Sequence, residues 1–141
     1  MSDLNFTITN ELGLAKDNEE LKNSLNGQFN GETAEVGLYL AMARVAQRSG
    51  YPEAAEVLKV IAWEEAEHAA KYAELTGRVS DCTKTNITQM MNGEVAANKF
   101  KAELAAKAKA ANLEELYTFI AHDARDEARH ACMLEGLLKR L

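Results

Sequence analysis

The sequence contains an internal repeat that covers most of its length. When the chain of 141 residues is shifted by 62 positions, one half aligns with the other without a gap. The segment EEAEHA (64–69) then falls on DEARHA (126–131). Identical pairs include Glu65 with Glu127, His68 with His130, and Gly31-Glu32 with Gly93-Glu94. Such self-similarity indicates two equivalent structural units, so the fold must contain two copies of one supersecondary motif.

Each unit has the pattern of a helical hairpin. One proline and eight glycines occur in the whole chain, so few residues interrupt a helix. Apolar residues recur at steps of three and four, as expected for helices with one buried face. The predicted helices cover residues 18–49, 52–76, 85–111 and 113 to near the C-terminus, with Gly50, Gly77 and Asn112 at the breaks. Two packed hairpins give an all-α four-helix bundle over residues 18–141, preceded by an arm at residues 1–17.

Charge and hydropathy exclude several classes of function. The net charge is −6 and no basic run occurs, so neither nucleic acid nor an anionic membrane surface is an expected partner. No apolar run approaches the roughly 18 residues of a membrane helix, and the N-terminus lacks the pattern of a signal peptide. Cys82 and Cys132 form no CxxC pair, so reduced thiols are expected. We therefore expect a soluble, cytoplasmic protein.

Glutamate and histidine side chains share equivalent helix faces in the two halves. Residues three apart project together, so Glu65 lies with His68, and Glu127 lies with His130. On the first helix of the first half, Glu32 and Glu35 share one face, and Tyr39 follows on that face. On the first helix of the second half, the acidic residue at the equivalent place is Glu94. A solvated acidic surface is the alternative, but the gap-free repetition of the whole set argues against it.

Carboxylates gathered in the interior of a bundle need cations to neutralise them. Without cations, burying so many negative charges would be very costly. Mixed carboxylate and imidazole donors suit iron or manganese better than zinc, whose structural sites favour thiolates. One glutamate from each of two helices, with Glu-x-x-His from each of the other two, is the pattern of ferritin-like di-iron or di-manganese bundles. The sequence therefore predicts a site for two metal ions.

The same motifs resemble those of the rubrerythrin branch of the ferritin-like superfamily. The resemblance rests on Gly31-Glu32, Glu65-x-x-His68, Gly93-Glu94 and Asp126-Glu127-Ala128-Arg129-His130, and it extends over about residues 20 to 140. It implies a centre of two iron ions, with manganese or a mixed pair as alternatives. The implied roles are bridging for Glu65 and Glu127, terminal for Glu32 and Glu94, and imidazole ligation for His68 and His130.

Two departures from the rubrerythrin pattern affect the expected chemistry. The chain shows no Cys-pair motifs of a rubredoxin domain, so electrons are expected from a separate donor such as a rubredoxin or a flavoprotein. The second glutamate that the family carries on the third helix is Ala97 here, and the extra glutamate is Glu35 in the other half. In the family, that glutamate exchanges with a histidine as the iron changes redox state. By symmetry the exchanging ligands here are Glu35 and His130, with His68 fixed.

Several neighbouring residues have two possible roles. Glu64 and Asp126 precede the bridging glutamates and could accept the imidazole N–H, or they could be surface charges. Tyr39 could hydrogen-bond a ligand or quench a radical, or it could pack in the core. His122 has no Glu-x-x-His partner and is expected to be a surface or core histidine.

The connection between the second and third helices bears on the oligomeric state. In a single-chain bundle it must span about 25 Å along the axis and about 10 Å sideways. Eight linking residues reach at most about 26 to 32 Å, so the crossover is barely possible. Exchange of hairpins between two chains removes this strain, and we expect a homodimer that could be hairpin-swapped.

The expected function is a redox enzyme. By resemblance to rubrerythrins, a reduced di-iron centre would pass two electrons to hydrogen peroxide and give water, as a defence against oxidative stress. The alternatives are a ferroxidase or iron-storage protein, a di-iron oxidase that uses dioxygen, and a metal-free helical interaction module.

Overall fold

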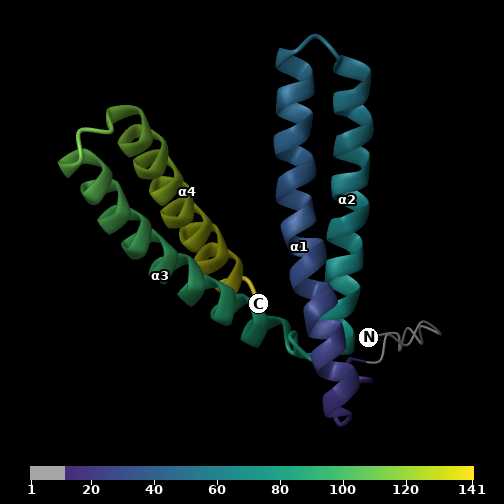
Figure 1. Cartoon of the computed structure of the whole chain (residues 1–141). Coiled ribbons are helices and arrows are strands. Elements are labelled where there is room, and N and C mark those ends of the chain that lie inside the picture. Colours follow the sequence, from purple (N-terminus) through teal and green to yellow (C-terminus); the bar gives the residue numbers. More distant parts are fainter. Residues whose placement is uncertain (1–11) are drawn as a thin grey trace. The chain divides into compact units, whose positions relative to one another are not determined.

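The computed structural model describes residues 12–141, and these form four α-helices with no strand among them (Figure 1). The helices are α1 (Glu19–Arg48), α2 (Pro52–Leu75), α3 (Thr83–Ala110) and α4 (Glu114–Leu138). Helix α1 packs against α2, and α3 packs against α4. The chain divides into two compact units between Val79 and Ser80, so each unit contains one hairpin and one copy of the repeat. The all-α fold predicted from the sequence is confirmed.

The turns of the hairpins occur where the backbone needs a positive φ. Gly50 has φ +84° and Asn112 has φ +58°, and each follows directly after the last turn of a helix. Glycine adopts this conformation without steric cost, and asparagine tolerates it better than most residues. Pro52 then occupies the first position of α2, where its missing N–H leaves no helical bond unmade. These residues fix the length of each hairpin and hence the register of its two helices.

Alanines form the contact between the helices of each hairpin. Ala43 and Ala62 are buried in the first hairpin, and their repeat equivalents Ala105 and Ala124 are buried in the second. A methyl side chain lets two helices approach closely, which brings side chains from both helices into reach of one another. Among the buried residues of the described chain, the one large aliphatic side chain is that of Ile120, in the second hairpin. Each hairpin therefore has a narrow core of small side chains.

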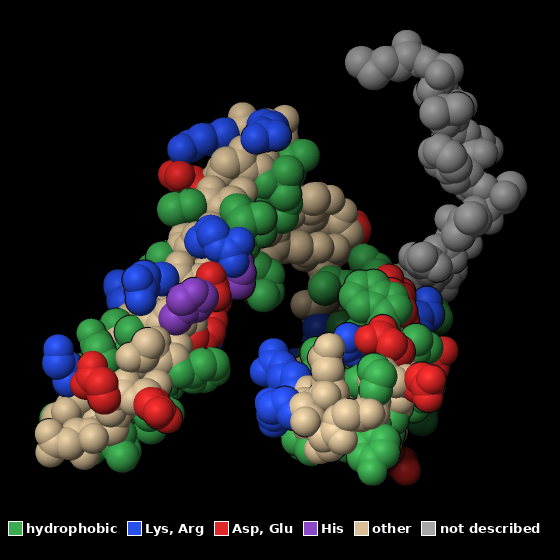
Figure 2. Space-filling model, turned by 90° about the horizontal axis from the view of Figure 1, so that it is seen from above, with side chains coloured by type: hydrophobic (Ala, Val, Ile, Leu, Met, Phe, Trp, Pro, Cys, Tyr) green, Lys and Arg blue, Asp and Glu red, His purple; other side chains and the backbone are tan. Residues whose placement is uncertain are grey.

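Larger apolar side chains lie on the outside of the hairpins. In the first hairpin Leu38, Met42 and Trp63 are exposed, and in the second Phe100 and Phe119 are exposed. Figure 2 shows hydrophobic side chains, in green, at the surface of the described residues. The two helices of a hairpin bury only the faces that they turn toward each other. Apolar side chains on their outer faces need a further layer of structure to cover them.

The segment before α1 is attached to the end of α2. The backbone N–H of Gly13 donates to Glu74 O at 2.8 Å, and that of Ala15 donates to Leu75 O at 3.0 Å. These bonds satisfy carbonyls that a helix end leaves unpaired. Of the predicted arm at residues 1–17, residues 1–11 lie outside the described part of the chain, and the rest packs on the first hairpin. In residues 12–141 no helix is long and apolar enough to cross a membrane.

Candidate metal centre

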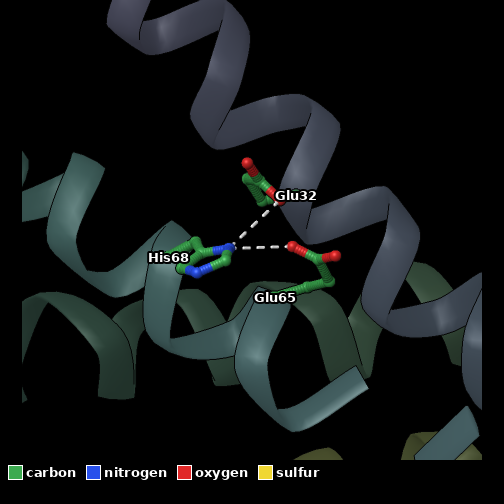
Figure 3. Close-up of side chains that lie close together, drawn as sticks. All are labelled: Glu32, Glu65 and His68. Atoms are coloured by element: carbon green, nitrogen blue, oxygen red, sulfur yellow. Dashed lines mark hydrogen bonds and ion pairs between the residues drawn. The ribbon is translucent and has the colours of Figure 1, made fainter. Parts of the chain in front are cut away.

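The first hairpin holds a group of three potential metal ligands. Glu32 on α1 and Glu65 and His68 on α2 each offer a donor atom, and these atoms lie within 4.8 Å of one another. His68 Nδ1 is 3.0 Å from Glu65 Oε2 and 3.9 Å from Glu32 Oε2 (Figure 3). Both glutamate side chains are less than one fifth exposed, whereas the imidazole is 60% exposed. Two carboxylates and one ring nitrogen thus converge between the helices.

The second hairpin repeats this arrangement at equivalent positions. Glu94 on α3 and Glu127 and His130 on α4 form a second group of the same size. His130 Nδ1 is 3.1 Å from Glu127 Oε2 and 3.7 Å from Glu94 Oε2. The distances match those of the first group within a few tenths of an ångström. Six of the seven residues predicted as ligands are therefore brought together, three in each hairpin.

The two carboxylates of each group share a hydrogen bond, and this perturbs both of them. The hydrogen bond with Glu65 raises the pKa of Glu32, and the same contact lowers the pKa of Glu65. In the second group the hydrogen bond with Glu127 raises the pKa of Glu94. Two close carboxylates repel one another when both are ionised, and that repulsion is part of the reason that the pKa of Glu32 and of Glu94 is raised. A divalent cation between them would neutralise both carboxylates, and an imidazole nitrogen lies within reach, so the donor set fits divalent metal ions.

Lys101 makes the second group different from the first. Its ammonium group contacts Glu127 Oε1 and lies 2.9 Å from Asp123 Oδ2. The contact with Lys101 is the main reason that the pKa of Glu127 falls to about 2, and Glu94 and His130 add to the effect. Neither Lys101 nor Asp123 was among the residues predicted from the sequence. The signal that could have found Lys101 is its position seven residues after Glu94, on the same helix face.

The residues expected to support the site lie outside the two groups of three. Glu35 is exposed and lies outside the three-residue group, although its charge contributes to the raised pKa of Glu32. Tyr39 is half-buried, and Glu64 is exposed. Asp126 contacts Arg129 at 3.0 Å and His122 at 3.5 Å, and Arg129 is the main cause of its lowered pKa. The exchange of Glu35 with His130 and the roles of Glu64, Asp126 and Tyr39 stay predictions.

Comparison with known proteins places this site in a family. A protein-family model described as rubrerythrin matches residues 23–90. Reverse rubrerythrin-1 of Clostridium acetobutylicum is 47% identical over 132 residues, which cover 92% of this chain and 73% of that protein. The chain belongs to the rubrerythrin family. An uncharacterized protein of Methanocaldococcus jannaschii is 49% identical over 138 residues, covering 98% of this chain and 97% of that one.

Membership in the rubrerythrin family agrees with the donor sets of the two hairpins. The family implies a ferritin-like fold and a di-iron centre, and each hairpin supplies two carboxylates and one imidazole. When bound, two such metal ions would be held by Glu32, Glu65, His68, Glu94, Glu127 and His130. The resemblance found in the sequence is therefore confirmed, and the donor types are those expected of a rubrerythrin.

Proposed function

We propose that this rubrerythrin-family protein is a di-iron peroxidase that reduces hydrogen peroxide to water. The proposal rests on the two equivalent groups of Glu, Glu and His, one in each hairpin. The balanced reaction adds two electrons and two protons to one hydrogen peroxide and yields two water molecules. Two iron ions held by these groups, each changing by one electron, would supply both electrons. A separate protein, such as a rubredoxin or a flavoprotein, returns the electrons to the centre.

The residues of the chain have two tasks in this reaction. The glutamate pairs would hold the metal ions, whose positive charge would offset the repulsion between the two nearby carboxylates of each pair. The imidazoles complete each donor set, since His68 Nδ1 and His130 Nδ1 both face the paired carboxylates. Glu35, one turn after Glu32 on the same helix, is the proposed ligand that responds to the redox state. Manganese or a mixed metal pair could occupy the same donors.

Anaerobic reduction of the iron-loaded protein, followed by one equivalent of oxidant, tests the proposed activity. We expect hydrogen peroxide to restore the near-ultraviolet absorption of the ferric centre within seconds, and dioxygen to act much more slowly. The peroxide consumed should equal half the electrons released by the protein. The reverse order of rates would contradict the proposal and favour a ferroxidase or a dioxygen-reducing oxidase. Protein with both Glu65→Ala and Glu127→Ala, taken through the same loading, serves as the control for iron bound elsewhere.

We further propose that the protein acts as a cytoplasmic homodimer in which hairpins could be exchanged between chains. The short segment between α2 and α3, which ends at Cys82, and the apolar side chains outside each hairpin support this arrangement. Sedimentation equilibrium should give twice the mass of the 15.5 kDa chain, independent of concentration in the micromolar range. A compact monomer at these concentrations would rule out the dimer.

A further inference from the structure

The cation beside Glu127 has no counterpart in the first hairpin. Under the 62-residue shift, Lys101 falls on Tyr39 and its second partner Asp123 falls on Ile61. Both members of this ion pair are therefore replaced by uncharged residues in the other half. The six grouped residues are identical in the two halves, so the ion pair at Glu127 and the extra carboxylate of Glu35, which falls on Ala97, are charge differences beside equivalent donors. Two groups with the same donors thus differ in their electrostatic surroundings.

Lys101 uses an atom that a metal ion would need. Glu127 has one carboxylate oxygen, Oε1, on the ammonium group and the other, Oε2, on His130 Nδ1. A metal ion takes lone pairs from the same oxygens, and an ammonium group beside it repels the ion. The Lys101 side chain is 27% exposed and that of Glu127 is 13% exposed, so water screens this repulsion only in part. The ammonium therefore competes with a metal ion for the second group.

Asp123 gives the ammonium a second position close by. Its Oδ2 is 2.9 Å from Lys101 Nζ, and it lies one turn before Glu127 on α4. The carboxylate of Asp123 is more exposed than that of Glu127, at 38% against 13%. Lys101 can thus release Glu127 and keep a charged partner. The cost of freeing Glu127 is smaller than it would be if the ammonium had to move into water alone.

We infer that Lys101 stands in for a metal ion in the second group: its ammonium neutralises Glu127 in the metal-free protein and withdraws to Asp123 when metal binds. The two groups then load unequally, and the group of Glu32, Glu65 and His68 takes metal first. The inference rests on the proposed metal centre. It makes Lys101 a positioning residue, which controls occupancy of the second group without itself binding metal.

The test measures metal affinity and not activity. Metal-free wild-type protein is titrated anaerobically with Fe(II), and separately with Mn(II), by calorimetry with a competing chelator. We expect two classes of site whose affinities differ by about tenfold or more, as one partly screened charge can produce. Lys101→Met should tighten the weaker class by about tenfold and change the stronger class by much less. The difference in affinity between the two classes should therefore become smaller. The same substitution should also lower the melting temperature of the metal-free protein.

Three further variants separate the inference from a purely structural role. Lys101→Arg keeps the charge and should keep two unequal classes. Asp123→Asn removes the second position, so it should weaken the weaker class, opposite to Lys101→Met. Lys99→Met removes an exposed lysine of the same helix and should change neither class. Opposite shifts for the Lys101 and Asp123 variants do not follow from loss of packing.

Each remaining outcome contradicts a specific statement. Two equal classes in the wild type, or weaker binding in Lys101→Met, would overturn the role of Lys101 and leave the metal centre standing. If Lys101→Met does not fold, an unchanged weaker class in Asp123→Asn overturns the inference in the same way. Absence of metal binding in the wild type would overturn the proposed centre and, with it, the inference.

Discussion

Replacing Glu65 and Glu127 together by alanine is expected to eliminate metal binding. Each residue supplies one of the two carboxylates of its group, and each also contacts the histidine of that group. Without them a metal ion would be left with one carboxylate and one imidazole per hairpin, too few donors to replace its hydration shell. We expect less than about one tenth of the wild-type iron content after anaerobic loading and desalting, measured by elemental analysis.

Metal-dependent stability provides a second measurement for the same variant. Ligand that binds only the folded state adds about 4 kcal/mol when its free concentration is a thousand times Kd. Chelation should therefore lower the melting temperature of the wild type and leave that of the double variant unchanged. Glu67→Ala, which removes an exposed carboxylate two residues after Glu65, is the matched control and should bind metal normally. Full iron content in the double variant would refute the assignment of both groups.

The helices could be predicted from the sequence because local residues determine where they begin and end. Gly50, Pro52 and Asn112 act through backbone conformation, which needs no knowledge of distant residues. The first helix, expected at residues 18–49, is Glu19–Arg48. The third begins at Thr83, two residues before the expected start, since the polar segment before it has no residue whose side chain caps the helix. Boundaries without such signals depend on packing.

The candidate site could be predicted in part, for a related reason. The repeat identifies residues that both halves share, and the six that the structure brings together are among them. Lys101 and Asp123 are differences between the halves, so a search for identities passes over them. A lysine also reaches far along and across a helix, and its partner is decided by the neighbouring helix, not by the spacing of the sequence. The same limit applies to Asp126, whose closest partner in the structure is Arg129.

A charged substitution on the apolar outer face of the first hairpin is expected to destabilise the protein strongly. Leu38, Met42, Val45, Tyr51 and Leu58 line an open hollow of about 570 Å³ that is almost entirely apolar. Met42 is half exposed in the hairpin, so the ammonium group of a lysine at this position would be solvated if nothing covered the hollow. We propose that the α3–α4 hairpin of a partner chain covers it, as the proposed exchange of hairpins between chains would require. Met42→Lys would then place an unpaired charge in a buried interface.

Met42→Lys should therefore destabilise the metal-free protein by about 3 kcal/mol or more, measured by urea denaturation. Gln47→Lys, on the exposed part of α1 outside the hollow, is the control and should change stability by less than about 0.5 kcal/mol. An equally small effect of Met42→Lys would show that nothing covers the hollow. Sedimentation of the variant identifies the source of the covering hairpin. If a partner chain supplies it, the variant should fall to the mass of a single chain. If the same chain supplies it, the variant should lose stability at an unchanged mass, because weakening a contact inside one chain does not alter its association.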